Sequence, residues 1–161
     1  MDDRLAATSD CQLEQIAGFL PISDRLGTAG QPKSDAYPAI AAAGYQVVIN
    51  LALTDSPNAL PNEAEIASNL GLEYLHIPVI WDNPTLADFQ AFANAMEAHR
   101  SQKIFVHCAA NKRVSVFVYL YRLSQGVAET IARQDLAKIW TPNEIWQTFI
   151  ETIAPDYLHK N

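Results

Sequence analysis

One short segment of the sequence combines a cysteine with cationic, amide and hydroxyl side chains. It reads His107-Cys108-Ala109-Ala110-Asn111-Lys112-Arg113-Val114-Ser115. The apolar residues 104–107 are typical of a buried strand, and the apolar residues of 113–124 are typical of a buried helix. A loop between a strand and a helix can turn several backbone N–H groups, and the helix N-terminus, into one concavity. Such a concavity binds a tetrahedral oxyanion and stabilises a thiolate, which makes a cysteine a nucleophile near neutral pH.

The residue types in this loop suit that chemistry. Arg113 has a planar guanidinium that can bind two anionic oxygens at once, and Ser115 can donate a hydrogen bond to the Cys108 sulfur. Asn111 adopts a positive φ more readily than other non-glycine residues, as a tight loop requires. The remaining cradle residues are Ala109, Ala110 and Lys112.

Two simpler interpretations stay open. A cysteine at a strand end is also a small apolar core residue. His107 is a candidate base, but we favour a strand-end residue that hydrogen-bonds the loop backbone and positions Cys108. Asn50 ends an earlier strand and is expected to face the same crevice and to brace loop 108–113.

The order of elements predicts the fold that positions these residues. Strands and helices alternate and the strands are apolar, which indicates an α/β fold of three layers, with a mostly parallel central sheet flanked by helices. Ligands in such folds lie at the carboxyl ends of the strands, so the segment after residue 107 is the expected site. We expect one domain over 1–161, with a core at about 19–140 and C-terminal helices within 127–153. The expected strands are 25–29, 45–51, 74–80 and 104–107, and the expected helices are 12–19, 34–43, 62–70, 85–100, 113–124, 127–139 and 142–153.

Composition excludes several classes of protein. The 161 residues include 18 acidic and 11 basic side chains, a net charge of −7, which argues against nucleic-acid binding. No apolar stretch of about 20 residues indicates a membrane span. Two cysteines, Cys11 and Cys108, and four scattered histidines give neither a disulfide scaffold nor a metal site, and we expect no cofactor. The polar N-terminus does not resemble a secretory signal, so we expect a cytoplasmic protein.

The Cys108-x4-Arg113-x-Ser115 pattern resembles the signature loop of the cysteine-dependent protein tyrosine phosphatases. Upstream segments occur in the order of the dual-specificity branch of that superfamily. These are Thr28–Pro32, Val48–Leu51 and Tyr74–Val79, the last followed by an acidic turn. The similarity runs from about residue 19 to 140 and is to a small bacterial, cyanobacterial-type group with an HC-x4-R-x-S loop.

The resemblance implies a phosphatase that hydrolyses a phosphoester through a phospho-cysteine. Its substrate would be a phosphorylated protein, such as one with phosphotyrosine, or a small phosphoester. The resemblance also implies that Asp82, which follows the third upstream segment, donates a proton to the leaving oxygen. The alternative interpretation is that Asp82 has no catalytic role and is only a turn residue. Asp88 is the second candidate for the acid. Trp81 would flank the pocket, while Trp140 and Trp146 are expected only to pack helices.

The loop length supports two further hypotheses. Four residues separate Cys108 from Arg113, whereas the usual phosphatase loop has five. A loop of four resembles that of the rhodanese-like sulfurtransferases, in which the cysteine would carry a persulfide. The third hypothesis is a catalytically weak pseudophosphatase module that binds phosphate or another anion.

Overall fold

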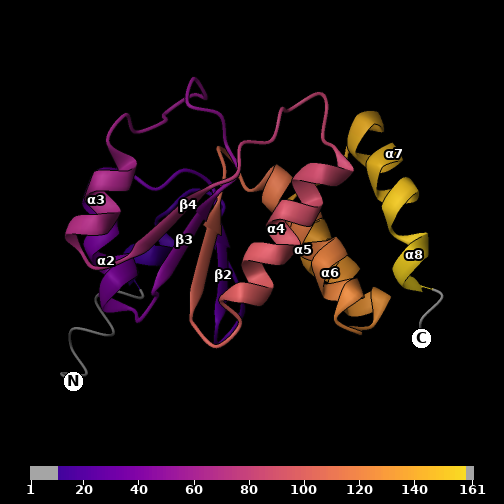
Figure 1. The fold of residues 1–161 in the computed structure, drawn as a ribbon, viewed down its shortest axis with the longest axis horizontal. Helices are drawn as coiled ribbons and strands as arrows, with labels where there is room; N and C mark the ends of the chain where they lie inside the picture. Colours follow the sequence, from indigo (N-terminus) through magenta and orange to yellow (C-terminus); the bar gives the residue numbers. More distant parts are fainter. Residues whose placement is uncertain (1–10, 159–161) are drawn as a thin grey trace.

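The computed structural model describes residues 11–158, which form a five-stranded sheet between two layers of helices (Figure 1). The strands are β1 (Leu20–Ser23), β2 (Leu26–Ala29), β3 (Val47–Asn50), β4 (Glu73–His76) and β5 (Ile104–His107). The helices are a 3-10 turn (Ser34–Ala36), α2 (Tyr37–Ala42), α3 (Glu63–Asn69), α4 (Leu86–Ala98), α5 (Lys112–Ser124), α6 (Glu129–Ile139), α7 (Glu144–Ile153) and α8 (Pro155–Leu158). Residues 11–14 are also helical.

The sheet is mostly parallel and has the order β1-β2-β5-β3-β4. Strands β2, β5, β3 and β4 pair in parallel, and β1 pairs antiparallel with β2. Helices α2 and α3 lie on one side of the sheet, and α4 to α7 lie on the other (Figure 1). This architecture confirms the expected three-layer α/β fold.

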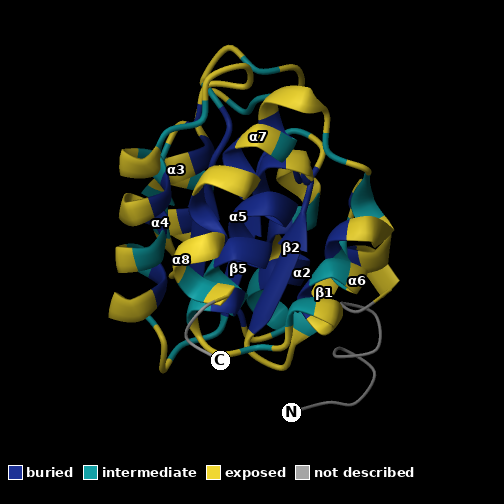
Figure 2. Ribbon diagram, turned by 90° about the vertical axis from the view of Figure 1, so that its right-hand side faces the viewer, coloured by how far each residue is buried: buried dark blue, intermediate teal, exposed yellow. Residues whose placement is uncertain are grey.

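Each side of the sheet has its own set of buried side chains. Phe105 of β5 packs in the set that includes Ile40 of α2 and Ala67 of α3, while Ile104 and Val106 pack in the set formed with α4 to α7. Helix α5 lies at the centre of the second set and is buried along most of its length (Figure 2). Its apolar residues therefore surround the helix axis, as the sequence indicated.

The sheet register brings the carboxyl ends of three strands together. His107 at the end of β5 lies beside Ala29 at the end of β2 and beside Asn50 at the end of β3. The loops that follow these strands therefore meet at one edge of the sheet, which is where ligands bind in folds of this class.

Several elements differ from the sequence-based expectation. Strand β1 was not expected, and β4 ends at His76, two residues before Pro78, whose nitrogen cannot donate to a sheet. In place of the expected helix at 12–19, the described residues are helical only at 11–14. Turns follow, with Gln15 bonded to Gln12 and Ile16 to Leu13, and Gly18 has a φ of 68°. Ser34 and Asp35 are residue types that favour helix N-caps, but neither caps a helix. The start of α2 is set instead by Pro38 in its first turn.

Glycine residues end two of the helices. Gly44 and Gly71 follow α2 and α3 with φ of 96° and 77°, in the left-handed region that ends a helix. No helix within residues 11–158 has the length and apolar character needed to cross a membrane.

Candidate active site

The loop between β5 and α5 begins with Cys108 and ends with Arg113. Asn111 precedes α5 with a φ of 64°, the left-handed conformation expected for it. Its side-chain amide donates to the Gly18 carbonyl at 2.8 Å and to the Thr28 hydroxyl at 3.0 Å, so it does not cap the helix. The first backbone N–H groups of α5 have no partner within the helix, and N–H groups at such a helix start can bind an anion.

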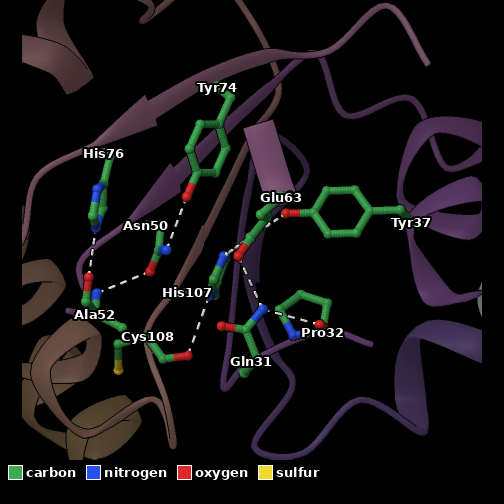
Figure 3. A network of polar contacts seen from close by, with 10 residues as sticks. All are labelled: Gln31, Pro32, Tyr37, Asn50, Ala52, Glu63, Tyr74, His76, His107 and Cys108. Atoms are coloured by element: carbon green, nitrogen blue, oxygen red, sulfur yellow. Dashed lines mark hydrogen bonds and ion pairs between the residues drawn. The ribbon is translucent and has the colours of Figure 1, made fainter. Parts of the chain in front are cut away.

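Consecutive side chains at the end of β5 point to opposite sides of the sheet, as strand geometry requires. The His107 ring lies on the α2 and α3 side, where Nε2 contacts Glu63, and Cys108 packs on the side of α5. The sulfur points away from the His107 ring (Figure 3). His107 is therefore not placed to act as a base on Cys108. Its Nδ1 lies 3.2 Å from the Cys108 carbonyl oxygen, the loop-backbone contact favoured from the sequence.

The segment after β2 supports the loop through backbone contacts. The Gln31 N–H donates to the Ala109 carbonyl at 3.1 Å, and Gly30 forms a β-bridge with Ala110. A Cβ atom at Gly30 would lie 2.7 Å from the Ala109 oxygen and 2.8 Å from the Ala17 oxygen. Only glycine permits this close approach of three backbone segments.

Arg113 is buried and only partly used by the protein. Its side chain is 5% exposed, and Nη1 donates to the Val79 carbonyl at 2.9 Å. Its Nε is buried without a hydrogen-bond partner in the described chain. A buried donor without an acceptor is costly, so this edge of the guanidinium is available to an anion.

The two candidate acids have different environments. Asp82 is exposed in the turn three residues after Val79, and it lines a surface hollow of about 280 Å³ together with Leu86 and residues of α7. Asp88 accepts from the Thr85 N–H while its own N–H donates to the Thr85 hydroxyl, which forms a capping box at the start of α4. Asp88 is thus occupied by helix capping, and Asp82 is the acid left free.

A cluster of three tryptophans adjoins this site, and only Trp81 was expected there. The Trp146 indole donates to the Trp81 carbonyl at 2.8 Å, and the Trp140 indole donates to the Ser115 hydroxyl at 3.0 Å. The Trp81 ring lies 5.9 Å from the Arg113 guanidinium carbon. Residues expected only to pack helices therefore hold the turn before Asp82 and the first turn of α5. Their roles depend on contacts 25 and 65 residues apart in the chain, which local patterns do not encode.

Two expected contacts are not formed. The Ser115 hydroxyl donates to the Lys112 carbonyl at 2.8 Å, so its hydrogen is not directed to the Cys108 sulfur. Asn50 does not brace loop 108–113. Its oxygen accepts from the Ala52 N–H, and its amide donates to the Tyr74 hydroxyl at 3.0 Å, which braces the turn after β3 (Figure 3).

The structure also reveals a buried carboxylate that the sequence did not indicate. Glu63 is 4% exposed and accepts hydrogen bonds from His107, Tyr37 and Gln31 (Figure 3). Burial favours the neutral form of Glu63, but the contacts with His107, Tyr37 and Gln31 outweigh it and hold the pKa of the carboxyl below its usual value. In the sequence Glu63 resembles an ordinary exposed acid in the first turn of a helix.

Within residues 11–158 no three His, Cys, Asp or Glu side chains gather in a way that could hold a metal ion. The residues brought together at this loop are a buried cysteine, a buried arginine and a helix N-terminus, which are groups able to bind an anion.

The family match and the fold place the chain in the superfamily of dual-specificity, protein tyrosine phosphatase-like proteins. The chain belongs to the family of the DSP-PTPase phosphatase fused to NAD+ kinase, whose model matches residues 22–147. Among solved structures it is similar to a putative phosphatase (DUF442) from Shewanella putrefaciens CN-32, with 33% identity and a TM-score of 0.83 over 91% of this chain and 97% of the other. It shares the fold of Tk-PTP, with 15% identity and a TM-score of 0.72 over 86% of this chain and 97% of the other.

The chain is also similar to a longer protein. It is 36% identical over 121 residues to the beta-lactamase hydrolase-like protein of Xylella fastidiosa. The matched region covers 73% of this chain and 27% of the relative, so the chain spans about a quarter of the length of that curated protein.

Proposed function

We propose that this chain is a cysteine-dependent phosphatase that hydrolyses a phosphoester through a phospho-cysteine on Cys108. Its substrate is a phosphorylated protein or a small phosphoester, and it acts in the reducing cytoplasm, where a free cysteine stays a thiol. The observation that carries the proposal is Arg113, which is buried, is held by Val79 on one nitrogen and leaves Nε without a partner. An anion bound there would receive the free edge of the guanidinium together with the N–H groups at the start of α5.

The reaction takes two steps. In the first, the Cys108 thiolate attacks phosphorus, the S–P bond forms, the ester P–O bond breaks, and the leaving oxygen takes a proton from the carboxylic acid of Asp82. In the second, a water oxygen attacks phosphorus while Asp82 takes a proton from that water. The new P–O bond forms, the S–P bond breaks, and inorganic phosphate leaves with the thiolate restored.

Each residue has one task in this scheme. Arg113 and the N–H groups of Ala109, Ala110 and the first turn of α5 stabilise the charge on the non-bridging oxygens. Asn111 fixes the loop conformation by its left-handed backbone and its bonds to Gly18 and Thr28. Lys112, exposed beside the Trp140 ring at 5.4 Å, adds positive charge at the rim.

The test is turnover of an aryl phosphate by the full chain and by Cys108→Ser, with rapid-quench mass spectrometry of the intact protein. We expect turnover that Cys108→Ser abolishes, and a transient mass increase of one phosphoryl group that is absent from the variant. Cys11→Ser, which changes the exposed cysteine, is the matched control and should retain both. Turnover that survives Cys108→Ser would overturn the proposal.

The short loop favours a second candidate, a sulfurtransferase that carries a persulfide on Cys108. Four residues between Cys108 and Arg113 make a smaller cradle, suited to a single sulfur atom. Exposure to thiosulfate would then add one sulfur to the mass of the protein, and an aryl phosphate would add nothing. Phosphate binding without turnover or adduct would instead support an anion-binding module.

A further inference from the structure

We infer that Glu63 is a positioning residue that turns two loop peptides so that their N–H groups face the bound anion, acting through His107 and Gln31. The inference rests on the proposed function and adds to it a residue from a different element, the first turn of α3. Glu63 itself does not touch the anion.

Glu63 contacts the two residues that hold the first two carbonyls of the loop (Figure 3). Its Oε2 accepts from His107 Nε2, and the other ring nitrogen of His107 lies 3.2 Å from the Cys108 carbonyl oxygen. Its Oε1 accepts from Gln31 Nε2 at 3.1 Å, and the backbone N–H of Gln31 donates to the Ala109 carbonyl at 3.1 Å. His107 donates to both oxygens only when each of its ring nitrogens carries a proton. In that form of the ring, one carboxylate anchors both contacts.

Because of peptide geometry, these two contacts determine the direction of the Ala109 and Ala110 backbone N–H groups. In a trans peptide the C=O of one residue and the N–H of the next point in opposite directions, and the described chain has no cis peptide bond. The Cys108 carbonyl is held on the His107 side, so the Ala109 N–H points to the opposite side, toward the sulfur. The Ala109 carbonyl is held by Gln31, so the Ala110 N–H points away from Gln31 in the same manner.

The anchor needs a carboxylate. Glu63 receives three donors, from His107 and Tyr37 on one oxygen and from Gln31 on the other. A glutamine in its place has one oxygen and one NH₂ group, so at least one of the two oxygen positions would present a donor to a donor. The contact to His107 or the contact to Gln31 would then be lost, and with it the orientation of one loop peptide.

Glu63→Gln tests the inference, because it preserves shape and removes the double acceptor. We expect Glu63→Gln to raise the inhibition constant of inorganic phosphate, and to lower kcat/KM for an aryl phosphate, by roughly tenfold or more, since one anion donor is misdirected. In ¹⁵N-labelled protein, phosphate should shift the Ala109 amide resonance strongly in the wild type and weakly in Glu63→Gln.

Tyr37→Phe is the matched control. It removes the third hydrogen bond to the same carboxylate and leaves His107 and Gln31 in place. We expect it to lower the unfolding midpoint while phosphate inhibition and the Ala109 shift stay as in the wild type. Equal losses of phosphate affinity in Glu63→Gln and Tyr37→Phe would show a purely structural role and would overturn the inference.

His107→Gln gives a second measurement if Glu63→Gln does not fold. A glutamine can reach Glu63 from the Nε2 position but has no group at Nδ1, so only the contact to the Cys108 carbonyl is lost. We expect weaker phosphate inhibition here too, and unchanged inhibition would contradict the inference. Failure of the proposed function can be distinguished from failure of this inference. Wild-type protein without Cys108-dependent turnover would contradict the proposed function, and that result is obtained before any Glu63 variant is compared.

Discussion

Arg113 donates from Nη1 to the Val79 carbonyl at 2.9 Å, which joins the end of loop 108–113 to the segment that leads to Asp82. This bond fixes the plane of the guanidinium, so Nε keeps one direction. It also holds the start of the turn that carries the candidate acid. The cation and the acid of the proposed reaction are thus positioned by one contact between elements far apart in sequence.

Arg113→Lys should distinguish the effect of the positive charge at this position from the effect of the planar guanidinium. Lysine keeps the positive charge but cannot bind Val79 and an anion with one rigid group. We expect a loss of about 2–3 kcal/mol in transition-state stabilisation, as for a charged hydrogen bond, measured as kcat/KM for an aryl phosphate. Arg133→Lys on α6, where Arg133 contacts Glu129 and Tyr119, is the control. Equal activity of Arg113→Lys and wild type would mean that the guanidinium does not bind the anion.

Asp82→Asn should affect substrates according to their leaving groups. An acidic phenol leaves without protonation, whereas an alcohol needs a proton. We expect little loss with the activated aryl phosphate and roughly 100- to 10,000-fold loss with an alkyl phosphate. Asp88→Asn, which removes the capping box of α4, should lower stability by about 1 kcal/mol without this dependence on the leaving group. The reverse pattern would assign the acid to Asp88, and equal losses of Asp82→Asn on both substrates would indicate a structural role for the turn.

Gly30→Ala should displace the backbone of loop 108–113. The added methyl group would lie 2.7 Å from the Ala109 oxygen, so backbone must move. We expect a loss of about 1–3 kcal/mol in the free energy of unfolding, together with weaker phosphate inhibition. Gly71→Ala is the control, because its Cβ would meet open space and its φ of 77° causes only local strain. It should lower stability and leave phosphate inhibition intact, and intact inhibition in Gly30→Ala would contradict the close support of the loop.

Glu63 should make the protein sensitive to acid. Its carboxyl is buried, yet the donors around it hold its folded-state pKa below the ordinary value of 4.5. A depressed pKa contributes stability that is present above the ordinary value and is lost as pH falls through the folded-state value. Denaturant unfolding between pH 7 and pH 3 should show a drop in wild type that is smaller in Glu63→Gln. Parallel curves would show that Glu63 is not ionised in the folded chain.

Local patterns were sufficient for most of the elements, though not for β1 or the helix expected at 12–19, and for the position of the loop between β5 and α5. Each of these signals lies within a few neighbouring residues. They are the apolar residues before Cys108, the apolar residues on all sides of α5, and the glycines at 44 and 71. Asn111 was found in the same way, because few residue types accept its backbone conformation. The order of these elements then limited the fold to a parallel sheet with the loop at its carboxyl edge.

The residues that support the loop could not be found in this way. Glu63 contacts His107 across 44 positions, and Trp146 contacts Trp81 across 65. Both contacts arise from the packing of layers and leave no periodic signal in the sequence. The contacts expected of Asn50 and Ser115 were wrong for a related reason, since the residue type does not specify the partner. Asn50 bonds Tyr74, and Ser115 bonds the Lys112 carbonyl.

The tryptophan cluster has an optical consequence. All three tryptophans of the chain lie in it, with ring centroids 5.5, 5.8 and 6.5 Å apart. Tryptophan emission from the folded protein therefore comes from one place, and the ring nearest Arg113 is Trp81, at 5.9 Å from its guanidinium carbon. An anion that neutralises this guanidinium changes the electric field at that ring. If the loop binds an anion as proposed, tryptophan emission would therefore report that binding without an added label.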